Sequence, residues 1–370
     1  MKPEHDESGG KPANSPTVQC LVSPSATKLN LPHTVMGMSG FELRLLQHYN
    51  QWGERYNQSQ DSRQLVLWKQ VMPQMHMSSV LIRRCVFAFS GMLALADTAP
   101  EVLWSDRLDD TAPALAQLHR FSFASFDHQV QLTSELVAAL QKNTISPENL
   151  GQLLVSTSFV MMVVGYLPSM PMVDFERRQG DYISLLEGTK VTHWMAYTRL
   201  KSPVLEYGMS PQLEMSEYSV LPLFKPYFSV MDDAELTPPR VKPVVLDTLV
   251  VLSQAVYECS HQCTDIPLFR FFYAAPSAWY TYVYDQHFAA LALVNLLCAT
   301  QLLVGYQFDR QHNMQVEYMR WYRQHNVDKY GDWRLEPDQH LYEAVVTQAL
   351  QLTYTDLKTF DPCRHVADQR

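Results

Sequence analysis

Hydrophobic positions recur at helical spacing along most of this chain from Phe41 onward. In the first such run, Leu45, Tyr49, Trp52 and Tyr56 are separated by four, three and four residues, so they share one face of a helix. Segments with strand-like alternation are scarce, and Asn-Gly hairpin turns are absent from the sequence. The pattern predicts an all-α fold, built as a single large multi-helix domain.

Several helix starts carry their own signals. Ser78 or Ser79 is suited to cap a helix whose apolar residues run from Val80 to Ala96. Ser146 precedes Pro147, a combination typical of a helix N-terminus. Further helices are predicted at 113–142, 244–262, 279–306, 314–324 and 339–357.

Two segments lack a polar face and are predicted to lie in the core. Residues 159–167 are hydrophobic on every side, and 288–306 is a run of nineteen residues without a charge. The second run contains Asn295, Thr300 and Gln301 and has no basic flank, which favours a buried central helix over a membrane span.

The ends of the predicted domain follow from composition. Residues 1–38 are rich in Pro, Ser and Gly, and we expect a disordered tail there, with no secretory signal. Residues 39–360 form the helical domain. Within it, residues 209–242 are rich in Pro, Met and acidic groups, which predicts a long loop.

The net charge indicates which kinds of partner the protein can bind, and its cysteines indicate the cellular compartment. Net charge is −9, from 29 basic and 38 acidic residues, and this balance argues against direct nucleic-acid binding. The six cysteines are scattered, as in proteins of a reducing compartment, so we expect the nucleus or the cytoplasm. Cys259 and Cys263 flank His261, but no second ligand cluster lies nearby, and no metal site is predicted.

Recognised catalytic motifs are absent from the sequence. It contains no Gly-rich phosphate loop, GxSxG elbow, HExxH or paired CxxC motif. Asp232 and Asp233 offer too few oxygen ligands for magnesium and lie in the predicted loop. Spatial triads are invisible in a sequence, so catalysis stays open, but we favour a non-enzymatic role and predict no cofactor.

Methionine and aromatic residues are unusually dense. The chain has 17 Met, 19 Tyr, 16 Phe and 7 Trp, side chains that can pack a core or line a pocket for an apolar molecule. Dense core packing is the simpler explanation for any one of them. The ligand-binding candidates are Phe159, Met162, Tyr166, Trp279, Tyr282 and Leu297.

The order of these segments resembles a known family. "FELRLLQHYN" followed by "LVLWKQVMPQMHMSSVLIRRCVFAFSGMLALA" is similar to the opening of the regulatory domain of fungal zinc-cluster transcription factors, in the sterol uptake control protein-like branch. "ISLLEGTKVTHWMAYTRLKSPV", "APSAWYTYVYDQHFAALALVNLLCATQLL" and "YMRWYRQHNVDKYGDW" resemble later segments in the same order. The resemblance covers roughly residues 40–345.

One part of the family pattern is missing. The family's DNA-binding module is a six-cysteine cluster that holds two zinc ions, whereas the N-terminal region here has only Cys20. No zinc ligand therefore carries over from the family. In sterol-responsive members the helical domain is thought to bind a sterol in an apolar cavity, and the resemblance implies a similar use here.

Two functions follow as hypotheses. The first is a transcription regulatory or co-regulatory protein of a fungal metabolite pathway. It would act through a partner such as a DNA-binding transcription factor, and would sense a sterol- or terpenoid-like molecule. The alternative is a metabolite-binding protein or enzyme of the same helical fold, acting on a terpenoid, sterol or polyketide-like substrate. A homodimer is compatible with either hypothesis.

Overall fold

The computed structural model describes residues 38–54, 66–104, 111–166, 170–198, 218–233, 235–305 and 313–367. These residues form helices joined by turns and short segments, and no β-strand occurs among them. The all-α prediction is therefore confirmed. The tail expected at 1–38 lies, except for Met38, outside the described residues.

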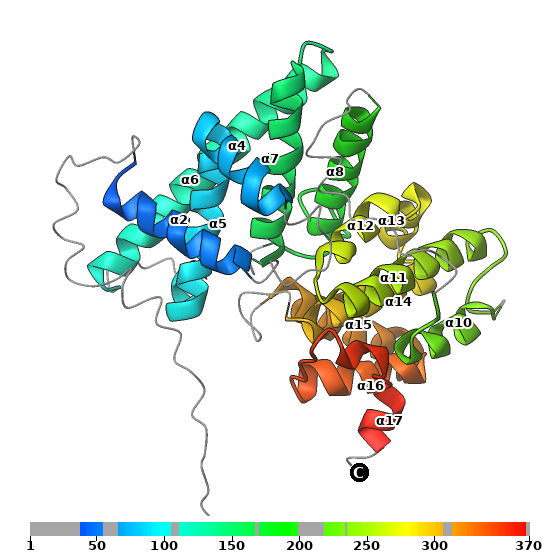
Figure 1. Cartoon of the computed structure of the whole chain (residues 1–370). Helices are drawn as coiled ribbons and strands as arrows, with labels where there is room; N and C mark the ends of the chain where they lie inside the picture. The colour runs from blue at the N-terminus through cyan, green and yellow to red at the C-terminus, as the bar shows by residue number, and fades with distance from the viewer. Residues whose placement is uncertain are drawn as a thin grey trace, which may run out of the picture.

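The helices form two lobes that lie side by side, with α7 and α8 between them (Figure 1). We call residues 38–166 the N-terminal lobe and residues 170–367 the C-terminal lobe. The N-terminal lobe contains α2 (Gly40–Gly53), η3 (Leu67–Val71), α4 (Met72–Ser78), α5 (Val80–Thr98), η4 (Pro100–Trp104), α6 (Pro113–Gln141) and α7 (Pro147–Tyr166). The C-terminal lobe contains α8 (Tyr182–Tyr197), η7 (Pro222–Phe224), α10 (Lys225–Met231), α11 (Lys242–Gln262), α12 (Ile266–Ala274), α13 (Ser277–Tyr284), α14 (Phe288–Leu303), α15 (Met314–Tyr330), α16 (Glu336–Tyr342), η8 (Glu343–Thr347), η9 (Asp356–Lys358) and α17 (Pro362–Ala367).

The predicted helix starts are confirmed by side-chain caps. The Ser79 hydroxyl accepts a hydrogen bond from the amide of Ile82 at the start of α5. Ser146 accepts one from the amide of Asn149 at the start of α7. Such caps satisfy amides that have no partner within the helix.

Aromatic rings fill the core of the N-terminal lobe. Trp52 of α2 packs against Phe89 of α5, with ring centroids 4.7 Å apart. Phe89 in turn contacts Phe159 of α7 at 5.8 Å. Leu45 and Tyr49 are buried beside them, so the predicted stripe of α2 does face the core. Tyr56, its fourth member, lies outside the described residues.

The C-terminal lobe is built around α14. Every residue of this helix is buried, which confirms the prediction of a central apolar helix. Helices α11 and α15 are among those that pack against it. A helix that buries all its faces needs neighbours on every side, and the C-terminal lobe supplies them.

Helix α7 belongs to both cores. Its residues Phe159 and Met162 pack in the N-terminal lobe, whereas Met161 and Val164 pack in the C-terminal lobe. Because successive residues of a helix point in different directions, an all-apolar helix can contact two cores at once. This shared helix connects the lobes.

Three element predictions were wrong. The helix expected at 339–357 does not continue to 357, because η8 ends at Thr347 and residues 348–355 are not helical. Residues 279–306 do not form one helix, because α13 and α14 meet at a bend of 106°, where Gln286 adopts a φ of 53°. A left-handed residue cannot continue an α-helix. Part of the loop expected at 209–242 is helical, since η7 and α10 occupy 222–231. Their prolines lie at the first helical positions, where proline is tolerated.

Candidate interaction site

The chain turns sharply where α4 meets α5. The segments Lys69–Ser78 and Val80–Thr98 are inclined to one another by 112°, and Ser79 is the extended residue between them. The Ser79 hydroxyl also donates a hydrogen bond of 2.7 Å to Oε1 of Gln152 in α7. The turn is thus tied to the helix that joins the two lobes. We call it the α4–α5 corner, defined by residues 69–84.

A groove runs along this corner. It has a volume of about 270 Å³ and is open to solvent. Its lining comes from the start of α5, the later part of α6 and the first half of α7. The lining residues are Ser78, Ser79, Val80, Leu81, Leu132, Glu135, Leu136 and Gln152.

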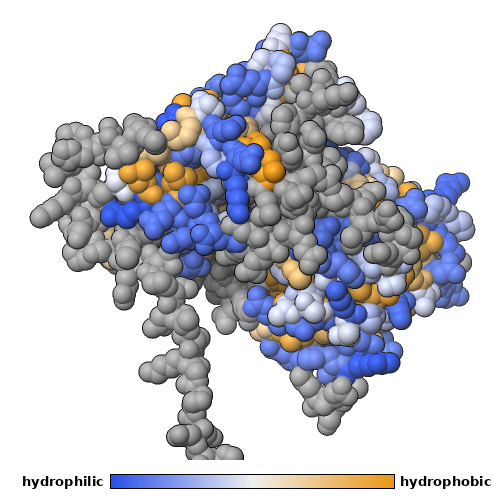
Figure 2. Space-filling model, viewed as in Figure 1, coloured by the Kyte–Doolittle hydropathy of each residue, from blue (hydrophilic) through white to orange (hydrophobic). Residues whose placement is uncertain are grey.

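Apolar side chains reach solvent at the same place. Met77 is 47% exposed and Val80 is 52% exposed, although each is a large hydrophobic residue. Figure 2 shows hydrophobic side chains at the surface of the N-terminal lobe around α4, among hydrophilic ones. Four of the groove's lining residues are apolar and four are polar, and protein-binding surfaces commonly combine both kinds.

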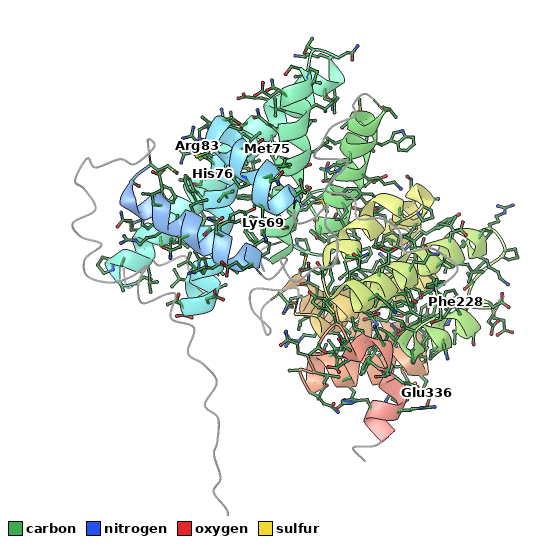
Figure 3. The ribbon with its side chains drawn as sticks, viewed as in Figure 1. Lys69, Met75, His76, Arg83, Phe228 and Glu336 are labelled. Atoms are coloured by element: carbon green, nitrogen blue, oxygen red, sulfur yellow. The ribbon has the colours of Figure 1, made fainter. Side chains whose placement is uncertain are left out.

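His76 and Arg83 flank, in sequence, the groove-lining residues 78–81. His76 of α4 is only 3% exposed, and its ring packs edge-on against Phe87 of α5 at 5.7 Å. Arg83 of α5 lies close to it (Figure 3). Burial, with a smaller contribution from the positive charge of Arg83, lowers the pKa of His76 to about 4. His76 is therefore neutral near pH 7.

The structure places five of the six residues predicted to bind a ligand. Phe159 and Met162 lie in the N-terminal core. Trp279 and Leu297 lie in the C-terminal core, with Tyr282 packed against its edge. These five contribute to two cores, and their role in binding stays a prediction. The side chain of Tyr166, the sixth, lies outside the described part of the chain.

Sequence reasoning missed a buried carboxyl group in the C-terminal lobe. Asp338 of α16 is fully buried and accepts hydrogen bonds of 2.7 Å from the hydroxyls of Tyr227 and Tyr322. Asn295 of α14 donates to it at 3.3 Å. Burial raises the pKa of Asp338 to about 6, although these three hydrogen bonds favour the charged form. In the sequence, Asp338 follows Glu336 and Pro337 and resembles a solvated acid in a first helical turn.

A second polar cluster joins α7, α8 and α12. His193 Nε2 lies 2.9 Å from the hydroxyl of Thr157, and the ring of His193 stacks on Tyr273 at 4.5 Å. One turn earlier on α8, the Lys190 ammonium donates to the carbonyl of Ala275. Burial lowers the pKa of His193 to about 4 and also lowers that of Lys190.

The cysteine pair weighed as a metal site is split between two environments. Cys259 is buried, whereas Cys263 is exposed and ends α11 with a left-handed φ of 53°. Among the described residues, no group of three or more His, Cys, Asp or Glu side chains is placed to hold a metal ion. In the same residues, no single helix has both the length and the hydropathy to cross a membrane.

Comparisons with known proteins give no relative. The chain matches no protein-family model, no curated protein and no solved structure.

Proposed function

We propose that this protein is a transcription regulatory or co-regulatory protein that acts through a protein partner, in a fungal metabolite pathway. The observation that carries the proposal is the groove at the α4–α5 corner. At about 270 Å³ it is smaller than most small-molecule pockets, which measure about 300–1,000 Å³. An open groove flanked by exposed Met77 and Val80 suits the anchoring side chains of another protein.

The link to transcription comes from the order of the helical segments, which resembles the regulatory domain of zinc-cluster factors. The net charge of −9 supports contact with DNA through a DNA-binding partner. The protein would then work in the nucleus, or move there from the cytoplasm with its partner.

A tethering assay tests this proposal. The full chain is fused to a heterologous DNA-binding domain in a fungal strain that carries a matching reporter gene. We expect reporter output to differ from that of the DNA-binding domain alone. The double variant Met77→Gln, Val80→Gln should return output toward that baseline, because it makes the anchoring surface polar.

The matched control is Val327→Gln, which changes an exposed valine of α15 in the other lobe. It should leave reporter output unchanged. If the full fusion is expressed and folded but gives the baseline output, the proposal is wrong.

The second candidate function is binding of, or catalysis on, an apolar metabolite of sterol, terpenoid or polyketide type. It is favoured by the cluster of Thr157, Lys190, His193 and Tyr273, because polar groups with perturbed pKa values gather at binding sites. Native mass spectrometry of protein purified from a fungal host tests it. A co-purified lipophilic molecule that raises the melting temperature would support it, and the absence of both effects would exclude it.

A further inference from the structure

Positively charged side chains gather where the end of α15 meets the start of α14. Helix α15 ends at Tyr330, and Gly331 follows with a left-handed φ of 84°, which turns the chain back. After this turn, the guanidinium of Arg334 lies against two aromatic rings, 4.5 Å from the centroid of Phe288 and 4.7 Å from that of Tyr330. Stacking of this kind fixes the position of a guanidinium.

Two further nitrogen-bearing groups lie at the same junction. The ammonium of Lys329 is 5.5 Å from the centroid of the Tyr330 ring. Burial, with smaller contributions from the positive charges of Arg334 and Lys329, lowers the pKa of His287, the residue that precedes α14. Both charged groups that shift this pKa are therefore positive. We call Lys329, Arg334 and His287 the basic cluster.

The chain does not neutralise the two cations of the basic cluster. Within the part of the chain that the structure describes, neither Lys329 nor Arg334 forms an ion pair, whereas Lys242 and Arg320 each pair with a carboxylate. Acidic residues outnumber basic ones by 38 to 29, so carboxylates are not scarce. Two unneutralised cations beside one ring repel each other, and a bound anion would remove that repulsion.

The basic cluster is open to a ligand. The guanidinium of Arg334 donates to the hydroxyl of Tyr330 at 3.2 Å and to the carbonyl of Glu235 at 3.5 Å. A guanidinium has further N–H donors, and these have no acceptor among the described residues. The Arg334 side chain is only half-buried, Lys329 is exposed and Tyr330 is 36% exposed, so a ligand can reach them from solvent.

The charge of the basic cluster favours a phosphoryl group. A phosphomonoester carries a charge of about −1.5 to −2 at pH 7, which matches the two fixed cations. A carboxylate would neutralise only one of them. Arg binds phosphoryl oxygens through its planar fork and Lys binds them as a point charge, so Arg334 and Lys329 supply two complementary modes of contact.

The surroundings of the basic cluster limit the ligand to a single phosphoryl group. Asp328 and Asp332 lie on either side of Lys329 and Tyr330 in sequence, and both are exposed. Their carboxylates would repel the phosphates that flank a bound one in a nucleic acid. Nucleic-acid binding also needs Lys and Arg clustered over a wider surface.

We propose that the basic cluster binds a phosphomonoester at the junction of α14 and α15. Lys329 and Arg334 contact the phosphoryl oxygens, and His287 responds to the bound charge. The phosphoryl group belongs either to a phosphorylated metabolite or to a phosphorylated residue of a protein, since both present the same anion. The site lies in the C-terminal lobe, away from the groove at the α4–α5 corner, so it goes beyond the proposed function and does not depend on it.

Isothermal titration calorimetry with two phosphorylated probes tests the proposal on the full chain. Glycerol 3-phosphate represents a metabolite, and a short phosphoserine peptide represents a protein. Each has a comparison compound with a carboxylate in place of the phosphoryl group, namely glycerate and the same peptide with glutamate. We expect at least one phosphorylated probe to bind about tenfold more tightly than its comparison, and added salt to weaken that binding.

The tighter of the two phosphorylated probes identifies the source of the phosphoryl group. If neither probe binds more tightly than its carboxylate comparison, the proposal is wrong.

Variants locate the binding. Arg334→Gln should weaken binding of the phosphorylated probe about tenfold, and Arg334→Lys should have an intermediate effect because it keeps the charge and loses the planar fork. Lys329→Gln should weaken it about threefold, as expected for an exposed charge. Arg320→Gln removes a charge from an exposed, ion-paired position on α15 and should bind like the unaltered chain.

Circular dichroism verifies that each variant is folded. Because Lys329 is exposed, Lys329→Gln still tests the site if Arg334→Gln does not fold. Binding by the folded variants of Lys329 and Arg334 that equals binding by the unaltered chain would refute the site.

His287 provides a second readout, which reports where the probe binds. A bound dianion favours the protonated ring, so the pKa of His287, followed by NMR, should rise toward its ordinary range when the tighter probe is added. The pKa of His76, in the other lobe, should stay at about 4. Binding that leaves the pKa of His287 unchanged would place the phosphoryl group elsewhere and overturn the proposal.

Discussion

The two cores of this protein are stabilised in different ways. In the N-terminal lobe, Trp52, Phe89 and Phe159 pack ring against ring in an apolar interior. In the C-terminal lobe, the carboxyl of Asp338 lies inside the core and is held by Tyr227 and Tyr322. The contacts among these rings depend on shape and buried area, whereas the contacts of Asp338 also depend on its protonation state. The two cores therefore make contributions to the stability of the chain that depend differently on pH.

The largest expected effect is the loss of a ring from the apolar core. Phe89→Ala removes a fully buried side chain that contacts both Trp52 and Phe159. We expect the free energy of unfolding to fall by about 3–5 kcal/mol, from lost burial and the cavity left behind. Chemical denaturation measures it. Val327→Ala, at an exposed position, should cost far less, and equal losses would show that this core is not tightly packed.

The next effect distinguishes the second core through pH. The pKa of Asp338 is about 6 in the folded protein, above its ordinary value of 3.8. A raised pKa means that the stability contributed by the protonated group is complete below about pH 4 and is lost as pH rises through about 6. The difference corresponds to about 3 kcal/mol.

Asp338→Asn should remove the pH-dependent part of the stability that comes from the carboxyl of Asp338. We expect its free energy of unfolding, measured from pH 4 to pH 7, to lack the decrease that Asp338 causes in the unaltered chain. Asp328→Asn, at an exposed position on α15, serves as the control and should keep it. If the two variants show the same pH dependence, the carboxyl of Asp338 is not the titrating group.

A smaller effect tests how closely the helices of the N-terminal lobe approach. A Cβ added at Gly91 of α5 would overlap the side chain of Ser122 on α6. Gly91→Ala should therefore cost about 1–3 kcal/mol. Gly188→Ala is the matched control, because nothing lies near its added Cβ, and it should stabilise α8 by about 0.5–1 kcal/mol. Thermal unfolding of both variants would reveal whether they differ in sign.

The smallest effect concerns the corner itself. Ser79→Ala removes the cap of α5 and the hydrogen bond to Gln152, and should cost about 1 kcal/mol. Ser78→Ala, at the exposed neighbouring residue, should cost less. Should Ser78→Ala prove the more damaging, the assignment of Ser79 as the cap would be wrong.

The fold could be predicted from the sequence wherever the residues of a single helix were enough to indicate where it begins or how deeply it is buried. Ser79 and Ser146 are N-cap residues, which can be recognised from the sequence next to them. Helix α14 lacks a polar face, which indicates burial. The bend between α13 and α14 was missed because apolar residues continue on both sides of it. Periodicity records which faces are buried, and it does not register a break when both halves are buried.

The candidate site was harder to predict because its parts come together only in space. His76 and Arg83 are separated by a bend of 112°, so helical spacing does not show that they are neighbours. Asp338 is close to none of its partners in sequence, since Tyr227 lies 111 residues away. Such contacts depend on tertiary packing, which a single sequence does not encode in any local pattern.

Helix α7 has a consequence for how the molecule comes apart. Because its opposite faces complete both cores, opening either lobe would expose apolar surface belonging to the other. The two lobes should therefore melt as one cooperative unit, and the amides of α7 should exchange with solvent only on global unfolding. If the chain is cut before or after α7, one of the two lobes loses the α7 side chains that complete its core. Expression of the isolated lobes should therefore yield insoluble chains.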